Sequence, residues 1–234
     1  MTTKIYPVIH HRDDDTTFDQ AATAHEAGAD GVFLISHDDR DDEVADILQR
    51  WTAESGLPPK FRVGVNFLGW GNLHALEIAV KVGAQMIWYD APGCSSQGLS
   101  TEGAQLVEHL RRLKAAGQLA PEVFASVAFK HQPVDQVPSA AAALARLQGW
   151  IPTTSGPATG EPPPLQKVVD MAGNGVLAIA SGMSPENVAP FVSHLSHILV
   201  ATGVSRDFHH FDFERLRAFV GAVRTADAAE GASV

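Results

Sequence analysis

Cysteine and positive charge are both scarce in this sequence of 234 residues. A single cysteine, Cys94, excludes an intrachain disulfide and the usual multi-cysteine zinc site. Lys and Arg total 17 against 27 Asp and Glu, a formal net charge of -10, which argues against a nucleic-acid partner or an anionic membrane surface. No apolar run is long enough to span a bilayer or to form a signal peptide. We therefore expect a cytoplasmic protein without membrane insertion.

Apolar residues make up 45% of the chain, enough for a sizeable core, and the length suits one domain. Short apolar runs recur, and a stretch with helical spacing follows almost every one. The predicted strands are 4–9, 31–35, 61–66, 85–89, 122–129, a weak run around Trp150, 175–180 and 198–201. The predicted helices are 18–27, 41–54, 73–82, a stretch within 102–116, 139–148, one capped by Ser184-Pro185-Glu186, and 212 to about 223.

Eight alternations of strand and helix over this length are what a (β/α)8 TIM barrel requires. A doubly wound open sheet uses the same alternation. Two details favour the barrel: no dinucleotide-type glycine fingerprint follows the first strand, and small-residue loops follow the last two strands. We predict a single barrel domain over residues 1–226 and a flexible C-terminal tail over 227–234, with the proline-rich stretch 157–164 as an extended loop of the site.

The loops after the last two predicted strands carry the most specific local signal. Ser181-Gly182 and Thr202-Gly203 each follow an apolar strand, and glycine lets the backbone approach a phosphate closely. These glycines can also be explained as tight strand-to-helix turns without a ligand. Because the pattern occurs on two consecutive strands, we favour phosphate binding. With the neighbouring loop 154–160, the predicted phosphate-binding residues are Ser155, Gly156, Ser181, Gly182, Thr202 and Gly203.

The middle strands supply candidate groups for proton transfer. Asp90 ends the fourth predicted strand, and Lys130 and His131 end the fifth, so all three can face one mouth of the barrel. A lysine there can form a Schiff base or act as a base if burial lowers its pKa, and a carboxylate can hold it or take a proton. An inert ion pair is the alternative. Asn66 and Asp90, on adjacent strands, form a plausible polar pair.

A histidine and carboxylate cluster follows the first two predicted strands. It contains His10, His11, Asp13, His37 and Asp38, residue types that can ligate a divalent metal. The same residues fit solvated loops whose Asp side chains cap the following helices. The sequence therefore leaves a divalent metal open, with His10, His37 and Asp38 as weak candidates, and assigns no cofactor.

Several segments together resemble one family over nearly the whole chain and in the expected order. The chain resembles the BtpA/SgcQ family in residues 62–68, 96–98, 124–131, 154–162, 181–188 and 201–203. Its most specific matches are Lys130-His131, 159–162 and 181–187. The resemblance implies a phosphate-binding TIM barrel, considered alongside ribulose-phosphate-binding enzymes. It also implies two settings, because one member is associated with photosystem I biogenesis and others with sugar utilisation.

The sequence departs from the family pattern at several strand ends. The departures are Ser36-His37 in place of an acidic-Asn pair, Trp88-Tyr89-Asp90 in place of an Arg-containing strand, Ser126 in place of an acidic residue, and 205–208 in place of a Lys-Asp-Gly ending. The late phosphate-type loops persist while inner positions differ. That pattern fits a divergent substrate, or a member that kept ligand binding and lost catalysis.

Three hypotheses follow. The first is an enzyme of isomerase, lyase or hydrolase type that acts on a small phosphorylated sugar or nucleotide-like molecule, with Lys130 or His131 assisted by Asp90 and Asn66. The second is a non-catalytic ligand-binding or complex-biogenesis factor. The third is a metal-dependent hydrolase that uses His10 or His11 with His37 and Asp38. The apolar outer helices and the family analogy suggest a homo-oligomer.

Overall fold

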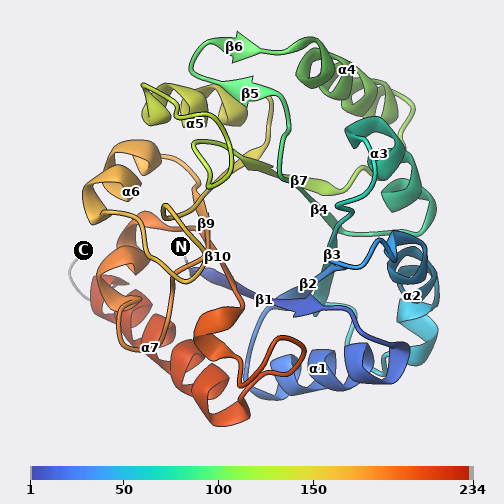
Figure 1. Ribbon diagram of the computed structural model, residues 1–234, viewed down its shortest axis with the longest axis vertical. Helices are drawn as coiled ribbons and strands as arrows, with labels where there is room; N and C mark the ends of the chain where they lie inside the picture. The colour runs from blue at the N-terminus through green and yellow to red at the C-terminus, as the bar shows by residue number, and fades with distance from the viewer. Residues whose placement is uncertain (1, 232–234) are drawn as a thin grey trace.

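Eight parallel strands close into a barrel in the computed structural model, which describes residues 2–231 (Figure 1). Around the ring the order is β1, β10, β9, β8, β7, β4, β3 and β2. The barrel strands are β1 (Lys4–His10), β2 (Gly31–Ile35), β3 (Arg62–Asn66), β4 (Met86–Tyr89), β7 (Glu122–Ser126), β8 (Ile151–Thr154), β9 (Ala178–Ala180) and β10 (His197–Val200). The predicted (β/α)8 barrel is confirmed, and the open sheet is excluded because β1 pairs with β10.

Helices surround the ring on its outside (Figure 1). They are α1 (Asp14–Glu26), α2 (Asp41–Glu54), α3 (Asn72–Lys81), α4 (Thr101–Ala115), α5 (Pro138–Leu147), α6 (Leu165–Ala172) and α7 (Phe213–Gly231), with the short 3-10 helices η1 (Ala189–His194) and η2 (Thr202–Val204). A hairpin of β5 (Cys94–Ser95) and β6 (Gly98–Leu99) lies between α4 and α5. Among residues 2–231, no helix has the length and apolar character needed to cross a membrane.

The barrel interior is filled by aromatic side chains in its lower half, the half nearer the N-terminal ends of the strands. Side chains alternate along each strand, so Tyr6, Phe33 and Phe124 point inward. Their rings meet edge to face, with centroids 5.9 Å apart for Tyr6–Phe33 and 5.1 Å for Phe33–Phe124. Gly64 on β3 leaves room for the Phe33 ring, which a Cβ there would strike. This packing makes the lower half a solid core.

The lower end of the barrel is also closed by paired polar groups. Arg62 contacts Glu122 at 2.6 Å, so an ion pair links β3 to β7 across the barrel. His197 stacks on Tyr6 with ring centroids 6.0 Å apart, and its Nδ1 lies 2.8 Å from the Ser196 hydroxyl oxygen. Each of these polar groups therefore has a partner within the protein.

Helix α7 ties the end of the chain to its first strand. Asp227 accepts hydrogen bonds from the Thr3 amide at 3.1 Å and from the Thr3 hydroxyl at 2.8 Å. Arg224 donates to the Thr3 carbonyl at 2.5 Å and to Asp30 at 2.6 Å. The helix thus continues beyond the predicted end at about 223 and covers 227–231 of the segment predicted as a tail. Residues 232–234 lie outside the described part of the chain.

Two other predicted boundaries differ from the structure. The strand predicted over 122–129 ends at Ser126, because Ala128 takes a left-handed conformation with φ 48° and turns the chain. The helix predicted after Ser184 forms only as η1. There the Asn187 side chain accepts from the Ser184 amide at 2.8 Å and donates to the Gly182 carbonyl at 2.8 Å, which holds the backbone in a local turn.

Candidate functional site

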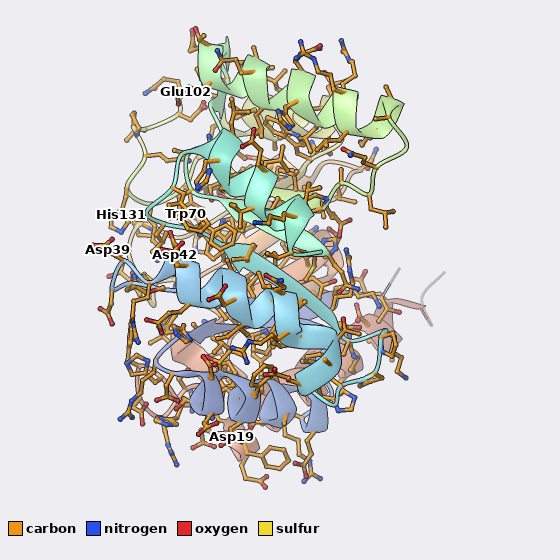
Figure 2. All side chains as sticks on the ribbon, turned by 90° about the vertical axis from the view of Figure 1, so that its right-hand side faces the viewer. Asp19, Asp39, Asp42, Trp70, Glu102 and His131 are labelled. Atoms are coloured by element: carbon orange, nitrogen blue, oxygen red, sulfur yellow. The ribbon has the colours of Figure 1, made fainter. Side chains whose placement is uncertain are left out.

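A cavity of about 520 Å³ opens at the C-terminal ends of the strands. Most of the predicted site residues lie on it: Asp90, Lys130, His131, Ser181, Gly182, Thr202 and Gly203 line its wall. Figure 2 shows His131, Trp70 and Asp39, from three different strand-to-helix loops, at this same end of the molecule. Functional residues of (β/α)8 barrels come from these loops, because parallel strands deliver their carboxyl ends to one mouth.

Asp90 follows β4 and is held from the neighbouring strand. Asn66 Nδ2 donates to Asp90 Oδ1 at 3.2 Å, so the predicted polar pair forms, with Asn66 buried behind the cavity wall. Burial among surrounding protein atoms raises the pKa of Asp90, and the Asn66 hydrogen bond and the charge of Lys130 act in the opposite direction. A carboxyl group with a raised pKa at a barrel mouth is suited to exchange a proton.

Lys130 reaches the mouth from the loop after β7. Its Nζ donates to Thr159 Oγ1 at 2.9 Å, and its backbone amide donates to Ser155 Oγ at 2.8 Å. Burial lowers the pKa of Lys130, while Asp90 raises it. Among the described residues, the ion pairs do not include one between Lys130 and Asp90. The two groups therefore share the cavity without neutralising each other by direct contact.

Gln132 fixes the geometry of these two loops, a role the sequence pattern did not signal. Its Nε2 donates to the Asp90 carbonyl at 2.6 Å and to the Ser126 carbonyl at 2.9 Å. Its Oε1 accepts from the Phe129 amide at 3.1 Å. One amide side chain thus joins the ends of β4 and β7. The neighbouring His131 is exposed with φ 67°, a left-handed conformation that aims its side chain at the cavity mouth.

His10 and His37 form the opposite wall with Phe208. The His10 ring lies 5.1 Å from the His37 ring and 4.2 Å from the Phe208 ring. His10 Nδ1 is 2.9 Å from the Phe208 carbonyl oxygen, which can only accept, so this nitrogen carries the proton. Burial lowers the pKa of His10 to about 4 and also lowers that of His37. His10 is therefore neutral at pH 7, and its Nε2 bears a free lone pair.

The third metal candidate, Asp38, is exposed and lies 3.7 Å from Arg40 in an ion pair. Within residues 2–231, no group of three or more His, Cys, Asp or Glu side chains is placed to hold a metal ion. Of the residues considered for metal binding, His10 and His37 line the cavity. These two rings meet edge to face, which is a packing contact and not the arrangement of two ligands that converge on one metal ion.

The ends of β9 and β10 present backbone amides to the cavity. Ser181 has φ 119° and Gly182 φ 77°, so the chain turns sharply after β9. Within the described part of the chain, the amides of Gly182, Met183, Thr202 and Gly203 donate to no protein acceptor, and all four residues line the cavity. Neighbouring free N–H groups form the kind of concave donor site that binds phosphate.

The two glycines also permit close packing of the loops around this site. A Cβ on Gly182 would strike the backbone of Glu161 and Pro162, and one on Gly203 would strike the carbonyl of Met183. The loop after β8 therefore lies directly on the turn after β9. The tight-turn explanation and the phosphate explanation of these glycines are thus both compatible with the geometry.

Ser155 and Gly156 do not line the cavity. Ser155 Oγ receives the Lys130 amide and donates to the Gly156 carbonyl at 2.9 Å, and a Cβ on Gly156 would strike Glu161. Lys167 Nζ, which the sequence pattern did not single out, donates to the carbonyls of Ala128 at 2.7 Å and Ser155 at 2.9 Å. These residues support the loops beneath the site.

The fold and the cavity at the carboxyl ends of its strands place this protein in the class of (β/α)8 barrels. No family model matches the chain, and no curated protein matches its sequence. Solved structures of similar fold include phosphoribosyl anthranilate isomerase from Thermus thermophilus, with 15% identity, a TM-score of 0.69, and coverage of 95% of this chain and 99% of that one. A protein described as native KDPGal has 16% identity, a TM-score of 0.66, and coverage of 97% and 100%.

A third similar structure is (S)-3-O-geranylgeranylglyceryl phosphate synthase from Thermoplasma acidophilum, in complex with its substrate sn-glycerol-1-phosphate. Its identity is 14% and its TM-score 0.64, and the match covers 96% of this chain and 94% of that one. At these identities the likeness establishes the shared barrel fold.

Proposed function

We propose that this barrel is an enzyme that binds a small phosphorylated molecule at the mouth of the cavity. The proposal rests on the amides of Gly182, Met183, Thr202 and Gly203, which donate to no protein acceptor within residues 2–231 and lie on one wall, opposite the Asp90 carboxyl group with its raised pKa. Two similar structures are named for phosphorylated compounds, which supports the same substrate class. The BtpA/SgcQ resemblance points in this direction as well.

The phosphate group of the ligand is held by the amides after β9 and β10. A dianion gains from several N–H donors at once, and no lysine or arginine is needed there. The exposed Thr202 hydroxyl is a further donor, whereas the Ser181 hydroxyl already donates to the Ala158 carbonyl at 3.4 Å. In this assignment Ser155 and Gly156 position the loop over the phosphate without touching it.

The groups for proton transfer lie on other walls of the cavity, in the loops after β4 and β7. Asp90, oriented by Asn66, and Lys130, oriented by Thr159, are the groups that exchange protons with the substrate. A raised Asp90 pKa and a lowered Lys130 pKa bring both groups closer to neutral pH, which favours transfer in either direction. Such a pair suits an isomerase, lyase or hydrolase reaction on a phosphorylated sugar or nucleotide-like substrate.

The second candidate function is a binding platform without catalysis. One contact beneath the cavity supports it. Trp88 Nε1 donates to Ser126 Oγ at 2.9 Å, so two positions that depart from the family pattern touch each other. An Arg-containing strand and an acidic residue in the pattern thus correspond to a neutral pair here. That exchange removes charge from beneath the mouth, where Asp90 and Lys130 supply charge from the loops after β4 and β7.

Titration calorimetry with inorganic phosphate and ribose 5-phosphate tests the binding site. We expect both to bind, and Gly203→Ala to weaken both about tenfold or more because its Cβ shifts the turn of amides. The absence of binding by both compounds in a folded sample would contradict the proposal. Lys130→Met and Asp90→Asn separate the two roles, since a platform keeps its cellular function with both changes and an enzyme loses it.

A further inference from the structure

The layer of side chains directly beneath the mouth is apolar on every side that the cavity reaches. Val8 lies two residues below His10, Ile35 two below His37, and Trp88 two below Asp90 on their strands. Leu199 and Ala180 complete this layer on β10 and β9. Since inward-pointing residues alternate along a strand, these five form the floor that a ligand meets. We call them the apolar floor.

The apolar floor offers a ligand no free hydrogen-bonding group. Its one polar atom, Trp88 Nε1, is already bonded to Ser126. A hydroxyl pressed against this floor would lose its water partners without replacement, which costs binding free energy. A simple sugar phosphate carries hydroxyl groups along its whole length, so the part of it that reached the floor would be left unpaired.

Phe208 extends the apolar surface up one side of the mouth. Its side chain is 55% exposed, yet it is held in place by the His10 contact to its carbonyl and by ring packing against His10 at 4.2 Å. An exposed, fixed phenyl ring beside a cavity is an element that a ligand can bury. Phe129 and Met183 add apolar surface at the same level.

The cavity is also larger than a phosphate group needs. Its volume of about 520 Å³ lies in the range of pockets that enclose a drug-sized molecule. The polar groups lie at the rim, with the amides after β9 and β10 and with Asp90 and Lys130 after β4 and β7. A ligand that fills the space therefore has one charged end and one apolar part.

We propose that the substrate is a phosphate ester carrying an apolar group of about the size of an aromatic ring, which inserts onto the apolar floor while the phosphate stays at the rim. This inference rests on the proposed function for the phosphate end and goes beyond it in defining the body of the ligand. It separates this site from one built for a bare sugar phosphate, whose floor would carry polar side chains.

Calorimetry with four probes tests the proposal: inorganic phosphate, ribose 5-phosphate, phenyl phosphate and phenol. We expect phenyl phosphate to bind at least about tenfold more tightly than ribose 5-phosphate, with a more negative heat-capacity change, because apolar surface is buried. Equal or weaker binding of phenyl phosphate would overturn the inference and leave the proposed function standing. Binding of phenol and phenyl phosphate without binding of inorganic phosphate or ribose 5-phosphate would support the floor and contradict the phosphate site.

Two variants locate the effect. Val8→Phe fills part of the space above the floor, and Phe208→Ala removes the exposed ring at the rim; each is expected to lower the affinity ratio of phenyl phosphate to inorganic phosphate at least about threefold. Leu119→Ala is the control, because Leu119 is also a large exposed apolar side chain (93%) but lies at the opposite end of the barrel. A ratio unchanged in both test variants would contradict the placement of the ring.

Discussion

The two ends of the barrel treat polar groups in opposite ways. At the lower end, Arg62 is paired with Glu122, and His197 is stacked on Tyr6 beneath a filled aromatic core. At the upper end, Asp90 and Lys130 share a cavity without an ion pair among the described residues, and a run of amides stands unpaired. Polar groups that are paired internally stabilise the fold, whereas polar groups left unpaired around a cavity are available to a ligand.

The two ends of the barrel also differ in how well they tolerate substitution. In the lower half, a ring such as Phe33 is in contact with aromatic neighbours on several strands, so its loss leaves a void. In the upper half, the cavity already exists, and shortening an exposed side chain at its rim, such as Phe208, creates no buried void. The packed core and the candidate site are therefore separated along the axis of the barrel. Four comparisons test this separation.

The largest effect is expected from Phe124→Ala. Phe124 is fully buried between Tyr6, Phe33 and His197, and the loss of its ring should lower the free energy of unfolding by about 3–5 kcal/mol. Phe208→Ala, at the upper end, should change it by no more than about 0.5 kcal/mol. Chemical denaturation of both variants measures the two values. Similar losses of unfolding free energy in the two variants would refute the division between a tightly packed lower half and an open upper half.

Next in size is Gly182→Ala, compared with Gly83→Ala. The two glycines have nearly equal positive φ values, 77° and 75°, but only Gly182 has backbone where the new methyl group would lie. The strain of a left-handed alanine applies to both and costs about 1 kcal/mol. We expect Gly182→Ala to lose at least about 1 kcal/mol more and to weaken phosphate binding, while Gly83→Ala keeps normal binding. Equal losses of stability and equal phosphate binding in the two variants would contradict a role for the close backbone contact at Gly182.

Acid should destabilise the protein before its carboxylates are protonated. Burial lowers the pKa of both His10 and His197 to about 4, below the ordinary value of 6.5. The unfolded chain therefore binds more protons between these values, so stability is full above pH 6.5 and falls as the pH drops toward 4. His10→Asn keeps a donor for the Phe208 carbonyl and should reduce this loss by about 1–2 kcal/mol at pH 4.5 relative to pH 7. Denaturation curves at the two pH values provide the measurement. If the variant loses as much stability at pH 4.5 as the parent protein, His10 does not contribute to the acid sensitivity.

The smallest effects are expected from one isosteric substitution at each end of the barrel. The raised pKa of Asp90 means that its ionised form is disfavoured in the folded protein, so this penalty is present at pH 7 and absent well below pH 4. Asp90→Asn should therefore raise stability at pH 7, by less than about 1 kcal/mol. Glu122→Gln should lower it by up to about 1 kcal/mol, because Arg62 loses its carboxylate partner in a pair that solvent partly screens. Opposite signs in the two unfolding measurements support the comparison, and the same sign would contradict it.

The period of apolar residues was enough to predict most of the barrel. Helix 41–54 carries a clear stripe of buried residues, including Val44, Leu48 and Trp51, and its predicted bounds equal those of α2. The short strands were harder to bound, since their ends depend on single backbone conformations such as the left-handed Ala128. The length of α7 depends on long-range partners, Thr3 and Asp30, which no local pattern contains.

The candidate site was predictable where position along a strand decides it. Asp90 directly follows β4, and Lys130 lies in the loop after β7, so both come from the carboxyl ends of strands that meet at the mouth. Gln132 was missed because its role consists of bonds to backbone carbonyls, which any polar residue in a loop can form. The Phe208 ring was missed because an aromatic residue in an exposed loop carries no signal until the contact with His10 is known.

The bonds between Thr3 and Asp227 have a consequence for engineering. They hold Thr3, the residue before β1, against helix α7, so a short linker can join these two ends of the described chain without crossing the cavity. A new start can then be cut at the exposed turn around Leu119, on the face away from the mouth. Such a circular permutant should form the same eight-stranded barrel from a reordered sequence, with the cavity at the carboxyl ends of the strands unchanged.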